Sequence, residues 1–254
     1  MNFEIGIPSF DRPLILFNKT LKFLNKNNIP KNLIRIFLKD EEQLTEYLKS
    51  CGNEYTYELT GQSGIMATRN YLQDYYHTKT DLEGVLFIDD DITDLTELGE
   101  KITMPLIDLI QYFFYECDSR GARLWSVNAL NNPFFMSEKI STNLKYCIGA
   151  FKGLILDRSK DVILCDIGHF EDMLFTCEYF LEDDVVVRFN KYGITTKYFE
   201  LKGGICGDLG GMKERQKEME ENAEYMLDRY GDMLKLKMKK WGADLKFNYT
   251  YKNE

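Results

Sequence analysis

Apolar and amphipathic stretches alternate regularly over the first ninety residues of the chain. Three short apolar runs, 3–8, 33–38 and 55–59, are rich in β-branched and aromatic residues and predict strands. Helical spacing of leucine and phenylalanine predicts a helix over 14–27, and a second amphipathic stretch predicts one over 41–49. This β-α-β-α-β order is typical of a nucleotide-binding, Rossmann-like α/β domain. The chain has no GxGxxG motif, so a dinucleotide cofactor is not supported.

The same alternation of strands and helices continues to residue 201, and a helical extension follows it. Further strands are predicted at 85–88, 124–129, 146–156 and 195–201, with helices at 65–72, 106–115, 185–192 and 212–230. The predicted fold class is α/β, with a mixed, mostly parallel sheet flanked by helices and a C-terminal helical extension. At 254 residues, we expect one domain over 1–211, with 212–254 adding a helix and a basic tail packed on it.

The most concentrated charge follows the most apolar strand. Residues 85–88 lead directly into Asp89, Asp90 and Asp91. Ligands of open α/β sheets bind beyond the carboxyl ends of the strands, which favours a site here. Alternate residues of an extended chain point the same way, so Asp89 and Asp91 could both face one hard cation. The alternative is a surface turn whose acids cap a helix over 94–98.

A glycine-containing loop and an arginine lie one unit upstream of these acids. Gly61 and Gly64 precede a predicted helix that carries Arg69. A helix N-terminus attracts anions and an arginine adds a bidentate phosphate donor, so this segment could hold a diphosphate beside the acids. The alternative is that Arg69 forms a surface ion pair.

A second acidic cluster consists of Glu182, Asp183 and Asp184, just before the predicted helix over 185–192. Adjacent like charges favour a proton on one member, which suits a general base. The alternative is favourable placement of acids against a helix N-terminus. His169 is one of two histidines, and we expect it to be a packed, hydrogen-bonded residue.

Three further stretches carry candidate functions. Residues 131–135 include two adjacent phenylalanines, which we expect to pack in the core, with stacking on a sugar or base as the alternative. Residues 203–211 contain five glycines, and such freedom suits a lid over a phosphate-bearing ligand. A basic patch is formed by Lys235, Lys237, Lys239 and Lys240 beside Trp241. Its default interpretation is a solvated surface, and the alternative is contact with a polyanionic acceptor.

Composition limits the binding partners and the cellular location that we expect for the protein. The formal net charge of −9 argues against a protein whose main task is to grip nucleic acid, although a local basic patch could still serve DNA. No apolar run approaches the roughly 20 residues of a membrane span and no signal pattern begins the chain, so we expect a cytoplasmic protein without a membrane partner. The six cysteines are scattered, which favours reduced core residues over zinc ligands or disulfides.

Five pieces of the sequence, in order, resemble a GT-A glycosyltransferase of the broad family-2 type. They are 7–9 (IPS), 64–70 (GIMATRN, resembling G-x-x-x-A-R-N), 87–91 (FIDDD, the DxD strand), 168–171 (GHFE, resembling G-G-F-D-E), and Glu182-Asp183 with Arg188 and Gly193 (the E-D…R…G block). The match covers most of residues 1–200. No Q-x-x-R-W block is present, which disfavours a processive polysaccharide synthase, and no histidine follows the last strand as a third metal ligand.

Within that class, the I-P-S-x-x-R-P start, the triple Asp and the late glycine-rich loop are similar to the TET/JBP-associated glycosyltransferases. That group is linked to sugar addition on hydroxymethylated pyrimidines in DNA, in phages, large viruses and kinetoplastids. The resemblance implies an inverting, metal-dependent transfer from a UDP-sugar, such as UDP-glucose, to 5-hydroxymethylcytosine or 5-hydroxymethyluracil in DNA, in the host cytoplasm or nucleus if the protein is viral. Three alternatives stay open: a protein, lipid or glycan acceptor, a relative without catalysis, and a two-metal nucleotidyltransferase.

The resemblance also implies roles for individual residues. Mn²⁺ or Mg²⁺ is expected on Asp89 and Asp91, where it would neutralise a diphosphate leaving group. Asp183 is the expected base, with Glu182 and Asp184 as alternatives. The residues expected to bind the donor are Pro8, Ser9, Arg12, Gly64, Arg69, Asn70, Asp89, Asp90, Gly203 and Gly204.

Overall fold

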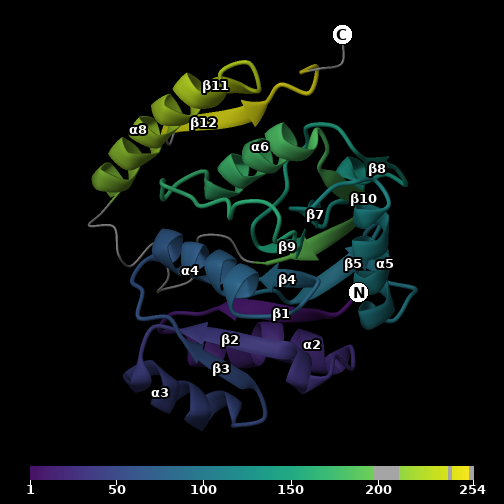
Figure 1. The fold of residues 1–254 in the computed structure, drawn as a ribbon, viewed down its shortest axis with the longest axis vertical. Helices are drawn as coiled ribbons and strands as arrows, with labels where there is room; N and C mark the ends of the chain where they lie inside the picture. The colour runs from purple at the N-terminus through teal and green to yellow at the C-terminus, as the bar shows by residue number, and fades with distance from the viewer. Residues whose placement is uncertain (197–211, 240–241, 252–254) are drawn as a thin grey trace.

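The computed structural model describes residues 1–196, 212–239 and 242–251, and it shows a mixed sheet with helices on both faces (Figure 1). In sheet order the strands are β3 (Thr56–Leu59), β2 (Ile34–Leu38), β1 (Phe3–Pro8), β4 (Gly84–Ile88), β9 (Phe151–Ile155), β7 (Leu124–Asn128), β10 (Val187–Thr195), β5 (Asp94–Glu97) and β6 (Glu100–Lys101). The short strand β8 (Ile140–Ser141) pairs with β10.

Helices on both faces of the sheet connect these strands. They are α1 (Pro13–Leu16), the π-helical turn η1 (Phe17–Leu21), α2 (Lys22–Lys26), α3 (Glu41–Cys51), α4 (Ile65–Thr78), α5 (Leu106–Asp118), α6 (Glu171–Asp183) and α8 (Met212–Tyr230), with short 3₁₀ turns η2 (Lys31–Leu33) and η3 (Pro133–Phe135). After α8, strands β11 (Leu234–Lys239) and β12 (Gly242–Phe247) form a separate two-stranded ribbon. None of the helices among the described residues is both long and apolar enough to cross a membrane.

Strand direction places several strand ends at one edge of the sheet. Strands β1 to β4 are mutually parallel. Strand β9 runs antiparallel to both β4 and β7, so β7 is parallel to β4, and β10 is parallel to β7. The carboxyl ends of β1, β4, β7 and β10 therefore lie along one edge, which we call the carboxyl edge. This is the edge where α/β sheets bind ligands.

Both faces of the central strands are buried, as their apolar sequences predict. In β4, Leu86 and Ile88 join the cluster that includes α3 and α5, while Val85 and Phe87 join the one that includes α4, α6 and α8. In the middle of the sheet, the Trp125 indole fills the space above Gly153, where a Cβ atom would lie 1.9 Å from Cε2 of the indole. Only a residue without a side chain fits at that position.

The α/β fold with a largely parallel sheet is confirmed, but two predicted helices are wrong. Residues 94–98 are mostly strand β5, and 185–192 are mostly strand β10, because a run of β-branched residues follows Asp184 and extends along β7. The helix in this region is α6, which ends where Asp184 adopts a left-handed conformation with φ 57°. Beyond residue 196, the predicted strand 195–201 lies outside the described residues.

The C-terminal region packs on the α6 side of the sheet. Ala223 and Met226 of α8 and Leu245 and Phe247 of β12 share an apolar cluster with Phe175 of α6. The predicted helix over 212–230 is confirmed, and residues 234–239 and 242–247 after it form a ribbon instead of a tail. Lys240 and Trp241 of the predicted basic patch lie outside the described residues.

Candidate active site

The three acids after β4 sit at the carboxyl edge, in a loop that is held from two sides. The Asp89 amide donates to the Ala150 carbonyl at 3.1 Å. The Thr20 hydroxyl of η1 donates to the Asp89 carbonyl at 2.7 Å and accepts from the Ile92 amide at 2.9 Å. Because strand β5 follows, the alternative role of these acids as a helix cap is wrong. A fixed loop therefore presents the acids at the ligand-binding edge.

The middle acid, Asp90, points into the protein and ties β4 to β1. Its carboxylate is fully buried and accepts hydrogen bonds from Arg12 at 2.7 and 3.2 Å and from Ser9 at 2.6 Å. Burial raises the pKa of Asp90 to about 7, while Arg12 and Ser9 act in the opposite direction. The sequence predicts donor contacts for these three residues, whereas the structure pairs them with one another. These three residues hold the acidic loop in place from its buried side.

Arg69 joins three parts of the carboxyl edge. It is 7% exposed, on α4, and its Nη2 donates to Asp89 Oδ1 at 2.8 Å. Its Nε lies 2.5 Å from Oε1 of Glu171, at the start of α6, and its Nη1 donates to the Gly149 carbonyl at 3.4 Å. The interpretation of Arg69 as a surface ion-pair residue is wrong, because a buried guanidinium holds two carboxylates at the edge of the sheet.

The first turn of α6 supplies a second carboxylate pair, Glu171 and Asp172. Acids are favoured there by the partial positive charge of a helix N-terminus. The Tyr146 hydroxyl donates a hydrogen bond to Asp172 Oδ2. A Cβ atom on Gly149 would lie 3.3 Å from Asp172 Cβ and 3.7 Å from Arg69 Nη2. The glycine thus lets Asp172 and Arg69 approach the same stretch of backbone from two sides.

Two buried groups in this centre have unusual surroundings. Burial raises the pKa of Glu171, against the effect of Arg69, and its Oε2 is a buried atom without a hydrogen-bond partner among the described residues. Lys152 of β9 is 4% exposed, and its Nζ lies 4.0 Å from the Phe175 ring centroid. Burial, with Arg69 nearby, lowers the pKa of Lys152 to about 8. Such perturbed groups cluster at functional sites.

The acids at the carboxyl edge fit a cation that arrives with a nucleotide. Asp89 and Asp91 offer carboxylate oxygens, and burial together with Asp89 raises the pKa of Asp91. Within the described ranges, no group of three or more acidic, histidine or cysteine side chains is arranged to hold a metal ion. Mg²⁺ is commonly bound through one or two carboxylates plus substrate phosphates and water. Two carboxylates suit that mode and not a closed protein cage.

The structure resembles solved nucleotide-sugar complexes. Residues 1–349 of S. aureus TarS, in complex with UDP-GlcNAc, align with a TM-score of 0.55 and 16% identity over 90% of this chain and 67% of that one. The mannosyltransferase PcManGT from Pyrobaculum calidifontis, in complex with GDP-Man and Mn²⁺, aligns with a TM-score of 0.52 and 11% identity. That alignment covers 90% of this chain and 64% of PcManGT, so this chain spans about two thirds of both neighbours.

The chain has the GT-A fold. No protein-family model and no curated protein matches the sequence. At these identities the likeness concerns the fold, and the chemistry of this GT-A chain must be argued from its own residues.

The predicted base residues lie at the opposite edge of the GT-A sheet, at the C-terminal end of α6. Asp183 accepts hydrogen bonds from Arg123 Nε at 3.0 and 3.1 Å and from Lys160 Nζ at 2.6 Å, and Glu182 pairs with the same arginine. The Arg123 carbonyl accepts a hydrogen bond from the Ile155 amide, and Ile155 pairs with Gly84, the first residue of β4. Arg123 therefore lies at the same position along the strand direction as Gly84.

Asp89 lies five residues further along the sheet, or about 17 Å at 3.3 Å per residue. The structure does not bring Glu182, Asp183 and Asp184 to the first acidic cluster. This separation argues against the predicted role of these three residues as the base.

The other predicted donor residues have mixed positions. Asn70 exchanges two hydrogen bonds with the Cys165 backbone, at 2.6 and 2.8 Å, and so fixes the loop before α6. Gly64 has φ 84° and caps α4, and Pro8 ends β1. Gly203 and Gly204 lie outside the described residues, as does the proposed glycine-rich lid.

The two phenylalanines of residues 131–135 are not core residues. Phe134 is 86% exposed and Phe135 is 62% exposed, so the core-packing prediction is wrong. The loop itself is held in place, because the Thr96 hydroxyl donates to Asn131 Oδ1 at 2.6 Å and Asn132 caps η3. His169 lies near Glu218 of α8, with 3.6 Å between Nδ1 and Oε2, as expected for a packed histidine.

Sequence reasoning missed Glu171, Asp172, Tyr146 and Lys152 as site residues. The adjacent acids stand at the start of a thirteen-residue helical pattern, and that position was the available signal. Tyr146 and Lys152 carry no local signal, because they reach the site through the antiparallel insertion of β9.

Proposed function

We propose that this chain is a metal-dependent, inverting glycosyltransferase that uses a nucleoside diphosphate sugar, with a UDP-sugar as the donor. The observation that carries the proposal is the meeting of Asp89, Arg69, Glu171 and Asp172 at the carboxyl edge of a GT-A sheet. Such a sheet, with acids after β4 and a second acidic pair across a buried arginine, offers separate groups to a leaving group and a nucleophile.

Donor binding involves the acids after β4. Asp91 and Asp89 would hold Mn²⁺ or Mg²⁺, which supplies charge neutralisation for the diphosphate that leaves. Arg69 places a buried positive charge next to Asp89 and supports the same region of the donor. Asp90, with Arg12 and Ser9, fixes the loop without contacting the donor.

Asp172 is the base in this proposal. The acceptor hydroxyl oxygen attacks the anomeric carbon, the bond from that carbon to the diphosphate oxygen breaks, and the hydroxyl proton passes to the Asp172 carboxylate. Attack from the face opposite the diphosphate inverts the anomeric centre. Tyr146 orients the carboxylate through its hydroxyl, and Glu171 is held by Arg69. A positioned general base contributes about 10²- to 10⁴-fold to the rate.

The acceptor proposed is a hydroxymethylated pyrimidine in DNA, such as 5-hydroxymethylcytosine. Its support is the motif resemblance together with the lysine-rich segment after α8. A hydroxyl on a protein, lipid or glycan is the alternative acceptor for the same chemistry.

The test combines a donor panel with an acceptor panel. Purified protein with Mn²⁺ is incubated with UDP-sugars, and UDP release is measured with and without oligonucleotides that carry 5-hydroxymethylcytosine or 5-hydroxymethyluracil. Mass spectrometry should show a hexose added to the oligonucleotide, and Asp172→Asn should lower turnover by about 10²- to 10⁴-fold.

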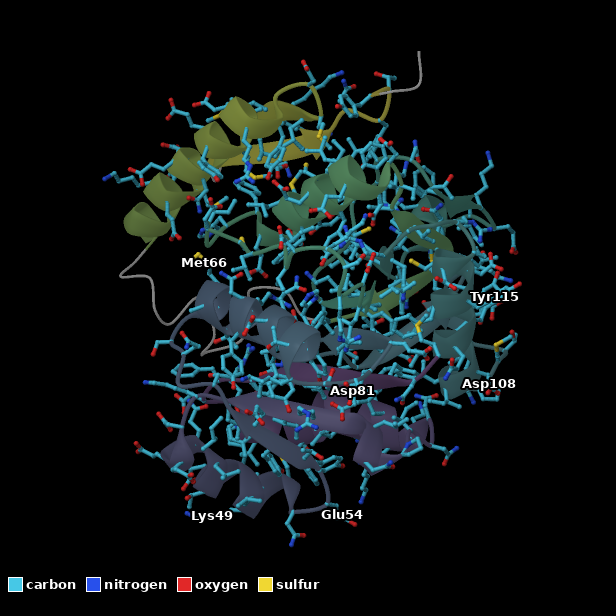
Figure 2. The ribbon with its side chains drawn as sticks, viewed as in Figure 1. Lys49, Glu54, Met66, Asp81, Asp108 and Tyr115 are labelled. Atoms are coloured by element: carbon cyan, nitrogen blue, oxygen red, sulfur yellow. The ribbon has the colours of Figure 1, made fainter. Side chains whose placement is uncertain are left out.

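The matched control is Asp81→Asn, an exposed acid in the turn before β4 (Figure 2), which should leave turnover unchanged. Metal-dependent UDP release without any oligonucleotide product would reject the DNA acceptor alone. Absence of UDP release with every donor and acceptor would reject the glycosyltransferase assignment.

A further inference from the structure

The ribbon of β11 and β12 places its lysines on one face. Residues directly opposite in an antiparallel pair share a face, and alternate residues of a strand return to it. Lys235 lies opposite Lys246 and Lys237 lies opposite Asp244, with Lys239 two residues further along. The described part of this face therefore carries four lysines and one aspartate, in a chain whose formal net charge is −9. We call it the lysine face.

Among the described residues, the lysine face has few acids to compensate its positive charges. Like charges placed directly opposite destabilise a strand pair, and Lys235 and Lys246 are such a pair. Asp244 forms its ion pair with Lys239. Lys246 and Lys239 lower the pKa of Lys237, which shows that its neighbours repel its charge. A surface that concentrates repelling cations on an acidic protein suits an anionic partner.

The opposite face of the ribbon connects to the proposed catalytic centre. Phe247, next to Lys246, is buried, and its ring centroid lies 6.1 Å from that of Tyr146. The Tyr146 hydroxyl in turn holds Asp172. The lysine face is thus carried by an element whose inner side packs against the residue that orients the proposed base.

We propose that the lysine face binds the phosphodiester backbone of a nucleic acid and so holds a polymeric acceptor beside the catalytic site. The proposal rests on the proposed function for the role of this binding in the reaction, and the binding itself is tested separately. Lysines that recur every second residue are about 7 Å apart along a strand, so several can reach successive anionic groups of an extended polymer. Each phosphate contact releases counterions and adds salt-dependent affinity.

An anionic membrane fits this face less well than a nucleic acid does. Stable attachment to a bilayer needs apolar side chains that enter it together with the basic ones. The apolar side chains of β11, Leu236 and Met238, are 50% and 62% exposed, but they alternate with the lysines and so lie on the other face of the ribbon. Contact through the lysine face itself is therefore electrostatic, as in sequence-independent binding to phosphates.

The experiment compares two triple variants that lose the same charge. One carries Lys235→Ala, Lys237→Ala and Lys246→Ala. The control carries Lys22→Ala, Lys26→Ala and Lys49→Ala, all exposed, with Lys49 on α3 at the far end of the molecule from the ribbon (Figure 2). Binding of the full chain to a fluorescein-labelled DNA duplex is measured by anisotropy between 50 and 300 mM NaCl, and thermal unfolding checks that each variant is folded.

The ribbon variant should lose affinity by about 10²-fold at 0.1 M salt, and its salt slope should fall by about 2.7, because each phosphate contact contributes about 0.9. The control should bind as the wild type does. Equal affinities for the two variants would overturn the proposal. So would a larger loss of binding by the ribbon variant toward phosphatidylserine vesicles than toward DNA.

Failure of this inference can be told from failure of the proposed function. UDP release from the donor, measured on the wild-type protein without DNA, reports the catalytic centre alone. A chain that turns over UDP-sugar while the ribbon variant binds DNA normally would refute the role of the lysine face and keep the glycosyltransferase. DNA binding through the ribbon without any turnover of UDP-sugar would support the lysine face and refute the glycosyltransferase.

Discussion

Asp183→Asn should reduce stability and leave catalysis per folded molecule intact, because its partners are structural. The Asp183 side chain is 2% exposed and accepts hydrogen bonds from Arg123 and Lys160. Asparagine keeps one acceptor oxygen and removes the charge. The Arg123 side chain, itself 9% exposed, then loses its most buried carboxylate partner.

The magnitude follows from the burial of these groups. Breaking a buried ion pair by removing one partner destabilises a protein by about 3–5 kcal/mol. Glu182 still pairs with Arg123, and the half-exposed Lys160 adds little, so the lower end of that range, about 3 kcal/mol, applies here. A chain of this size loses about 2–4 °C in melting temperature per kcal/mol. The expected fall is therefore about 6–12 °C.

The assay pairs thermal unfolding with turnover well below the melting temperature. Asp172→Asn should show the reverse pattern, with turnover reduced by about 10²- to 10⁴-fold and little change in melting. Asp184→Asn is the matched control, because this neighbouring acid is exposed and asparagine tolerates its left-handed backbone. If Asp183→Asn melted with the wild type and abolished turnover, the division of α6 into a catalytic and a structural end would be refuted.

Three further outcomes are expected. Gly153→Ala should destabilise the protein by about 3 kcal/mol in urea unfolding, since the new Cβ would lie 1.9 Å from the Trp125 indole; unchanged stability would show that the indole can move aside. Lys152→Met should be more stable than the wild type at pH 7. Because the buried amine binds fewer protons than in the unfolded chain between its lowered pKa of about 8 and 10.5, that advantage should shrink as pH rises through this window, and a pH-independent difference would contradict the assignment. Removal of divalent cations with EDTA should abolish UDP release and Mn²⁺ should restore it, whereas full activity in EDTA would exclude a metal role for Asp89 and Asp91.

The local sequence predicts much of the fold and roughly half of the candidate site. The strand over 85–88 is recognisable because its apolar residues alternate between two buried faces, and the acids after it mark the carboxyl edge. The antiparallel course of β9 is not recognisable, because pairing direction depends on contacts far apart in sequence. For that reason the local sequence does not predict that Lys152 and Tyr146 belong to the candidate active site.

The choice between the two acidic pairs shows a second limit. Glu171-Asp172 and Glu182-Asp183 stand at the two ends of α6, a helix of thirteen residues and so about 20 Å long. Both pairs look alike in composition, and only the direction of the helix across the sheet decides which one meets the acids after β4. The β-branched run after Asp184 was the local sign that a strand, and not a helix, begins there.

The pairing of Arg12 with Asp90 has a consequence for how relatives of this chain would diverge. The two residues are 78 positions apart, yet they form one ion pair in which the Asp90 side chain is fully buried and the Arg12 side chain is 19% exposed. Loss of the arginine alone would leave the fully buried Asp90 carboxylate without its ion-pair partner, so natural selection should retain or exchange the two residues jointly. A homologue that lacks the arginine is then expected to carry an uncharged residue between two acids, and this linked change would be a means to trace its descent.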